Sequence, residues 1–205
     1  RFTNEAGNYN AMGGAFHSFD RAGFDYPNLP CWLIVDSEYR RRYDLPGCLA
    51  GEPAPDWMAT GQTIEELAAV LDIDPASLGT TLDRFNEHAE VGADPDFGRG
   101  ESAYDAFNGD ATLEGVERTL QPLDAPPYWA VEVESGSLGT NGGPKTDTRA
   151  RVLALDGGVN KGLYAAGNVM AAPTGMVYGG AGGTLGPALT FGFIAGVDAA
   201  GHALT

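Results

Sequence analysis

A glycine-rich run near the C-terminus, residues 162–196, limits what this chain can fold into more than any other feature. It reads GLYAAGNVMAAPTGMVYGGAGGTLGPALTFGFIAG. The apolar residues 163–166 predict a short strand that Gly167 ends. Gly186-Pro187 predicts the start of a helix, since proline is tolerated in a first turn. A strand, a glycine loop and a helix N-terminus therefore follow one another, and such a terminus favours anions or electron-rich rings.

Two motifs in this run carry a resemblance to a known family. GLYAAGN (162–168) and YGGAGGTLGPALTFG (178–192) resemble the C-terminal signature of the 3-ketosteroid Δ1-dehydrogenases, within the fumarate reductase/succinate dehydrogenase flavoprotein superfamily. The usual form there is close to GLYAAGN followed by YPGPGATIGPAMTFG. The resemblance implies part of an FAD-dependent oxidoreductase that desaturates a 3-ketosteroid or a similar cyclic ketone. Gly179 and Ala181 replace the family's prolines, so we expect a looser loop and a substrate that can differ from a typical steroid.

The same resemblance implies the domain organisation. We expect an α/β fold with an α+β part: a cap, or substrate-covering, domain over residues 1–138, and the C-terminal piece of a Rossmann-like FAD-binding domain over residues 139–205. The boundary falls in the glycine-rich turn 139–143.

A dinucleotide fingerprint is missing from the sequence. Such a site needs GxGxxG after a strand, which brings a helix N-terminus to the pyrophosphate. The nearest match, Gly180-Ala181-Gly182, has Leu185 in place of the third glycine. In the superfamily the fingerprint lies near the N-terminus of a much longer chain. We therefore expect that this chain alone does not hold FAD, and that its partner is an N-terminal FAD-binding half, either a separate chain or a missing region.

Three residues match catalytic positions of the resembling family. Desaturation of a ketone removes a proton next to the carbonyl and a hydride from the neighbouring carbon, and the flavin accepts the hydride. The resemblance assigns the phenol of Tyr178 and the backbone N–H of Gly182 to polarising the carbonyl oxygen. It assigns proton abstraction to Tyr9, in a segment like RFxNEAxxY. A phenol has a pKa of about 10, so Tyr9 needs a shifted pKa or the coupled tyrosine of the family's N-terminal part.

Flavin contacts are expected at both ends of the glycine loop. In the family the flavin sits near the end of the strand, and N–H groups at the start of the helix stabilise the negative charge of the reduced flavin. The residues that the resemblance assigns to the cofactor are Gly167, Asn168, Thr184, Leu185, Gly186 and Ala188. Without the resemblance, Asn168 is equally a turn residue that satisfies its own backbone, and Tyr9 is a half-buried, hydrogen-bonded aromatic.

Local patterns predict the other elements. Residues 1–30 are dense in Gly, Asn and Pro and predict a loop-rich entry with short strands. A buried strand is expected in 31–36, and Arg40, Arg41 and Arg42 then read as a solvated helix face. Residues 91–127 are acidic and turn-like, 128–133 form a strand, and 146–164 form strands joined by a turn at 156–158.

Two capping patterns predict a pair of helices. Thr63 and Glu66 form a capping box at the start of the first. Asp74 and Pro75 supply the N-cap and first position of the second, whose Leu78, Leu82 and Phe85 recur at helical spacing and are expected in the core.

Composition excludes several functions. Twelve basic and 28 acidic residues give a net charge of −16, which repels nucleic acid and anionic lipid. No apolar run is long enough for a membrane span. Cys31 and Cys48 form no CxxC pair, and reduced thiols fit a cytoplasmic protein. No metal site is expected, because the three histidines (His17, His88 and His202) are scattered and the acids of 91–127 do not fit a calcium loop.

Three alternatives stay open. A fumarate-reductase-like enzyme normally clamps its dicarboxylate with His and Arg, whereas here Asn141 and Lys145 flank the GG pair and residues 169–183 contain neither His nor Arg. An ene-reductase running in the reverse direction is a close variant of the favoured reading. A cap-bearing subunit without turnover is the third, and the retained Tyr9, Tyr178 and Gly182 argue against it.

Overall fold

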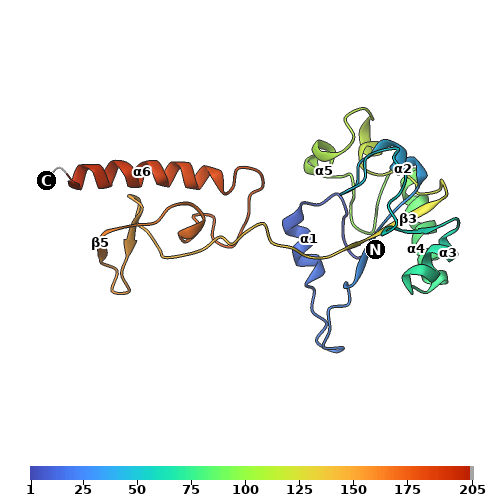
Figure 1. Cartoon of the computed structure of the whole chain (residues 1–205), viewed down its shortest axis with the longest axis horizontal. Helices are drawn as coiled ribbons and strands as arrows, with labels where there is room; N and C mark the ends of the chain where they lie inside the picture. Colours follow the sequence, from blue (N-terminus) through green and yellow to red (C-terminus); the bar gives the residue numbers. More distant parts are fainter. Residues whose placement is uncertain (204–205) are drawn as a thin grey trace. The chain divides into compact units, whose positions relative to one another are not determined.

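The computed structural model describes residues 1–203, with side chains through Gly201. It divides into two compact units, Arg1–Ser135 and Gly136–Thr205, so the division falls three residues before the expected one. Each unit mixes helices with antiparallel strands (Figure 1). Within residues 1–203, no helix combines the length and apolarity needed to cross a bilayer.

A three-stranded sheet forms the centre of the first unit. β3 (Tyr128–Val133) lies between β1 (Cys31–Val35) and β2 (Ala59–Gly61), and both pairings are antiparallel. The register sets Leu33 opposite Val131 and Thr60 opposite Trp129. The strands expected in 31–36 and 128–133 are therefore confirmed.

Two capped helices pack beside this sheet. They are α3 (Ile64–Leu71) and α4 (Pro75–Val91). The hydroxyl of Thr63 accepts the Glu66 N–H at 3.2 Å, and the Glu66 carboxylate accepts the Gln62 N–H at 2.7 Å. Asp74 accepts the Ser77 N–H at 2.9 Å. Both caps are confirmed, and the predicted core positions are buried, namely Leu78, Leu82 and Phe85.

Three short helices lie where loops or turns were expected. α1 (Tyr9–Phe16) forms within the predicted entry loop, and α5 (Ala103–Asn108) and the 3-10 helix η1 (Gly115–Arg118) form within the acidic stretch. For α1 and α5 the prediction was wrong because it weighed glycine content above the capping residues Asn8 and Ser102. Asn8 accepts the Ala11 N–H at 2.9 Å and fixes the first turn of α1.

The arginine run is also different from the prediction. In α2 (Ser37–Arg42), Arg41 pairs with Glu38 at the surface. Arg40 is instead buried, and its guanidinium donates to the Glu52 carbonyl at 2.9 Å and to the Cys48 sulfur at 2.7 Å. The loop that follows α2 thus supplies the hydrogen-bond acceptors for the Arg40 guanidinium. Sequence spacing alone does not reveal these contacts.

The second unit is built on a hairpin and one long helix. β4 (Arg151–Leu153) pairs antiparallel with β5 (Val159–Tyr164), and η2 (Gly167–Val169) and α6 (Leu185–Ala203) follow. The strand expected in 163–166 ends earlier, at Tyr164, and α6 begins one residue before the predicted start. A small core holds the hairpin, η2 and α6 together, made of Val152, Ala165, Met170 and Phe191. The glycine loop connects η2 to α6.

Candidate active site

The loop before α6 is shaped by backbone conformations that favour glycine. Gly180 and Gly182 have φ values of +101° and +88°, a region that side chains rarely adopt. The Gly180 carbonyl accepts the Gly183 N–H at 2.9 Å, and the Gly182 carbonyl accepts the Gly186 N–H at 2.8 Å. A Cβ added at Gly182 or Gly186 would meet no atom within 4 Å. The loop therefore offers bare backbone that a flat ligand can approach closely.

Tyr178 is held in the same loop. Its side chain is half-buried, and its ring lies so close to Gly183 that a Cβ there would stand 3.0 Å from the Cε2 atom. The structure therefore brings together two of the predicted catalytic residues, the phenol of Tyr178 and the backbone of Gly182.

The predicted cofactor residues lie at the two ends of this loop, and these two ends contact each other. Gly167 opens η2 with a φ of +68°, and a Cβ there would be 3.0 Å from the Cβ of Ala188 in α6. Asn168 follows it and is exposed. Thr184, whose carbonyl accepts the Ala188 N–H at 3.1 Å, leads into α6. Leu185 and Gly186 form the first turn of this helix.

A glycine pair outside the predicted set supports this arrangement. The Gly142 N–H donates to the Asn168 carbonyl at 3.0 Å. A Cβ at Gly143 would fall 1.8 Å from the Val169 carbonyl oxygen, so only glycine fits there. In the sequence, the doublet Gly142-Gly143 was the signal for this contact, but it was interpreted as part of a turn at the domain boundary.

Tyr9 belongs to the first unit. It is the first residue of α1 and 56% exposed. The segment before Tyr9 is bound to residues of the stretch 94–105, which ends in the first turn of α5. Arg1 donates to both carboxylate oxygens of Asp94 at 2.9 and 2.7 Å, and Asn4 donates to Asp105 at 2.9 Å.

Asp94 is the centre of this anchor. Its side chain is fully buried, and the hydrogen bonds from Arg1 hold the pKa of its carboxyl well below the usual range. The Arg1 guanidinium also lies 4.9 Å from the ring centres of Phe85 and of Phe97. Nothing in the sequence spacing pointed to this long-range contact.

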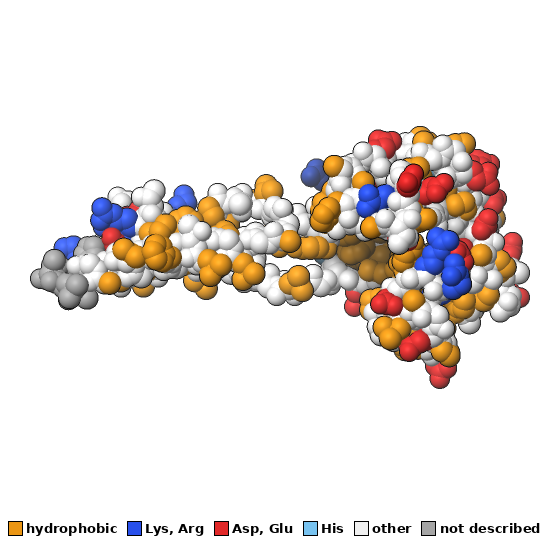
Figure 2. Space-filling view, turned by 90° about the horizontal axis from the view of Figure 1, so that it is seen from above, with side chains coloured by type: hydrophobic (Ala, Val, Ile, Leu, Met, Phe, Trp, Pro, Cys, Tyr) orange, Lys and Arg blue, Asp and Glu red, His pale blue; other side chains and the backbone are white. Residues whose placement is uncertain are grey.

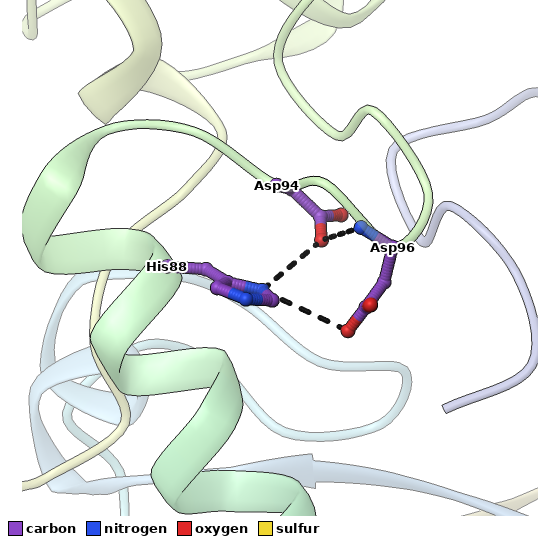
Figure 3. Close-up of side chains that lie close together, drawn as sticks. All are labelled: His88, Asp94 and Asp96. Carbon is purple, nitrogen blue, oxygen red and sulfur yellow. Dashed lines mark hydrogen bonds and ion pairs between the residues drawn. The ribbon is translucent and has the colours of Figure 1, made fainter.

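His88, Asp94 and Asp96 form a cluster that resembles a metal site in its donors (Figure 3). The His88 Nδ1 atom lies 3.6 Å from Asp94 and 3.7 Å from Asp96. Both carboxylates already have a cationic partner, however: Arg1 for Asp94 and Arg84 for Asp96. The cluster is therefore a charge network whose carboxylates are neutralised, and it fits a metal ion poorly.

Comparison with known families decides the class. The family described as an FAD binding domain matches residues 1–185. The chain belongs to this FAD-binding flavoprotein family. Its mixed α/β units agree with that fold, and FAD is the cofactor of the family.

Named relatives of this flavoprotein confirm the resemblance to ketone dehydrogenases. The chain is 43% identical over 203 residues to 4-oxocyclohexanecarboxylate 2-dehydrogenase of Sinomonas cyclohexanicum, covering 99% of this chain and 35% of the relative. It is 43% identical over 182 residues to 3-oxosteroid 1-dehydrogenase of Mycolicibacterium smegmatis, covering 86% of this chain and 32% of that one.

A solved structure matches as well. The crystal structure of 3-ketosteroid delta1-dehydrogenase from Sterolibacterium denitrificans, in complex with 1,4-androstadiene-3,17-dione, superposes with a TM-score of 0.87 at 36% identity. The match covers 98% of this chain and 37% of that one. The flavoprotein chain described here thus spans about a third of the length of the relatives that it matches.

Proposed function

We propose that this chain is the ketone-binding part of an FAD-dependent dehydrogenase that introduces a carbon–carbon double bond beside a ring ketone. The superposition of 98% of the chain on a 3-ketosteroid dehydrogenase is the observation that carries this proposal. In this proposal, the first unit serves as the cap domain, and the second unit completes the FAD-binding domain. An N-terminal FAD-binding half, in the same or another polypeptide, completes the enzyme.

Tyr178 and Gly182 polarise the ketone in this proposal. The Tyr178 hydroxyl and the Gly182 N–H donate hydrogen bonds to the carbonyl oxygen, and these bonds strengthen as the oxygen gains enolate charge. The tight loop supports this role because its hydrogen bonds and positive φ angles hold the backbone around Gly182 in one conformation before substrate binds. Preorganised donors need no rearrangement when charge develops.

Tyr9 takes the proton in this proposal. Its Oη atom accepts a proton from the carbon next to the carbonyl, and the electron pair of the broken C–H bond forms the enolate that the loop stabilises. The exposed position of Tyr9 at the start of α1 is compatible with contact to a substrate. Because an ordinary phenol is a weak base at neutral pH, a second tyrosine from the N-terminal half is expected to relay the proton.

The flavin-facing residues come from the two ends of the loop. FAD, when bound, supplies the acceptor for the hydride. Gly167 and Asn168 on one side, with Thr184, Leu185, Gly186 and Ala188 on the other, would hold its ring edge. Gly186 leaves open space beside the backbone of the first turn of α6, which fits a flat ring at a helix N-terminus.

Two ring ketones are the leading substrates. A 3-ketosteroid is favoured by the structural match. A 4-oxocyclohexanecarboxylate is a second candidate, favoured because that dehydrogenase matches 99% of this chain whereas the steroid enzyme of Mycolicibacterium matches 86%. Dicarboxylate reduction ranks lower, since residues 169–183 supply no His or Arg clamp.

Replacing the Tyr178 hydroxyl tests the proposal. In the flavin-loaded complex, Tyr178→Phe should lower kcat for the preferred ketone about 100-fold, because one oxyanion-hole donor is lost. Tyr104→Phe is the matched control, since Tyr104 is an exposed tyrosine of α5 outside the proposed site, and it should keep full activity. Steady-state kinetics with an artificial electron acceptor measures both. Unchanged turnover in Tyr178→Phe would instead support a cap-bearing subunit without a catalytic role.

A further inference from the structure

The side of α6 that faces away from its own unit is apolar along most of its length. Four large apolar side chains recur every fourth residue and are 58–75% exposed. We call them the outer stripe: Leu185, Leu189, Phe193 and Val197. Between residues 185 and 200 the helix carries one charged residue, Asp198. In Figure 2 hydrophobic side chains gather along this unit, whereas acidic ones gather on the other.

The outer stripe is not needed for the core of its own unit. The opposite side of α6 already supplies those contacts: Ala188 meets Gly167, and Phe191 packs against the small core. Asp198 also lies on that side and accepts the Tyr164 hydroxyl at 2.9 Å. A helix that is apolar on both sides is normally buried on both sides.

The other long helix of the described residues, α4, shows which residues this protein places on a helix surface that faces solvent. Four of the five exposed positions among residues 83–91 of α4 are charged, namely Asp83, Arg84, Glu87 and Glu90, and the fifth is Val91 at the end of the helix. The contrast within one acidic protein indicates that the outer stripe of α6 meets something other than water.

The occupant follows from what this chain contains and what its relatives add. It belongs to an FAD-binding family, yet no GxGxxG fingerprint occurs in it. Roughly two thirds of each named relative lies outside the match. The outer stripe begins at Leu185, one of the proposed flavin contacts, so a polypeptide that brings FAD to the start of α6 also reaches the stripe.

We infer that the outer stripe of α6 is the docking surface for the polypeptide that carries the FAD fingerprint. This inference rests on the proposed function for the identity of the partner. The four-residue spacing forms the kind of ridge that packs into the groove of another helix. Gly192 and Gly196 lie on the same exposed side and let a partner backbone come close. The partner therefore presents an apolar helix face.

Co-purification tests this surface. The affinity-tagged chain is co-expressed with the part of the Sinomonas cyclohexanicum dehydrogenase that it does not match, and FAD is added. We expect a yellow complex from the unchanged chain. The double variant Leu189→Lys/Phe193→Asp should bind the same polypeptide at least about tenfold more weakly and purify colourless.

A matched variant and three outcomes make the test decisive. Val91→Lys/Phe107→Asp changes two apolar residues of the first unit that are 75% and 82% exposed, and it should still give the yellow complex. Circular dichroism of each chain alone checks folding. The inference is overturned if the stripe variant binds equally well, if the unchanged chain captures no partner, or if the variant only converts a dimer of this chain to a monomer in sedimentation. A yellow complex that oxidises no ketone would contradict the proposed function but would still support the docking surface.

Discussion

Single glycines decide the geometry around the proposed site. Gly167 combines a left-handed backbone with close packing on Ala188, and Gly182 combines a left-handed backbone with open space. A side chain at Gly167 would therefore cause backbone strain and would also crowd Ala188. A side chain at Gly182 would cause backbone strain alone. The motif GLYAAGN owes its last glycine to this packing.

Gly167→Ala should destabilise the protein. We expect a loss of about 2–4 kcal/mol in the free energy of unfolding, from the left-handed backbone and from overpacking against Ala188. Gly179→Ala is the control, because Gly179 has an ordinary φ and nothing within 4 Å of its missing Cβ. Urea unfolding followed by circular dichroism measures both variants. Equal stability of the two would contradict the packing argument.

Sequence reasoning predicted a shared loop for two proposed site residues and missed contacts that span the chain. The common location of Tyr178 and Gly182 was predictable because a continuous motif contains both. The meeting of Gly167 with Ala188 confirms that the two ends of the motif come together. The pairing of Arg1 with Asp94 joins residues 93 positions apart, and neither residue lies in a local pattern. Such contacts depend on the folded path of the chain.

At the scale of elements, capping decided which predictions held. α3 and α4 carried complete N-cap signals, and both begin where those signals placed them. α1 carries a cap at Asn8 as well, but Gly13 and Gly14 lie inside it, and the glycine content suggested a loop. Tertiary contacts compensate for that low propensity: Phe16 is buried and packs edge-on against Phe2.

Asp94→Asn should loosen the segment that leads to α1. Removing the buried carboxylate takes from Arg1 one of its two carboxylate partners, the other being Glu5, and should cost about 2 kcal/mol. The pKa of Asp94 is lowered in the folded state, so its contribution is complete above the unfolded pKa of about 4 and is lost as the pH falls below it. The wild-type protein should lose stability on acidification, and the variant should lose less.

Unfolding by urea at pH 7 and at acid pH measures this effect. Asp83→Asn is the control, because Asp83 is an exposed residue of α4. The stability of this variant should equal that of the wild type at both pH values. An Asp94→Asn protein with the same pH dependence as the wild type would show that the anchor does not contribute.

At the scale of the whole molecule, the proposed function gives this chain the residues that bind a ketone and only part of those that bind a flavin. It belongs to an FAD-binding family, spans about a third of its relatives and lacks their expected fingerprint. Family membership could be predicted from the loop motif alone. The identity of the ring ketone could not, because substrate choice depends on pocket shape, which the motif does not encode.

Anaerobic reduction of the flavin tests the central claim most directly. The chain is purified as a yellow complex with its FAD-binding half, and 4-androstene-3,17-dione or 4-oxocyclohexanecarboxylate is added without oxygen. We expect one of these ketones to bleach the flavin absorbance in a single turnover and to yield the desaturated ring. A complex that stays yellow with both ketones, yet is reoxidised by fumarate after chemical reduction, would contradict this expectation and assign the protein to the reductases.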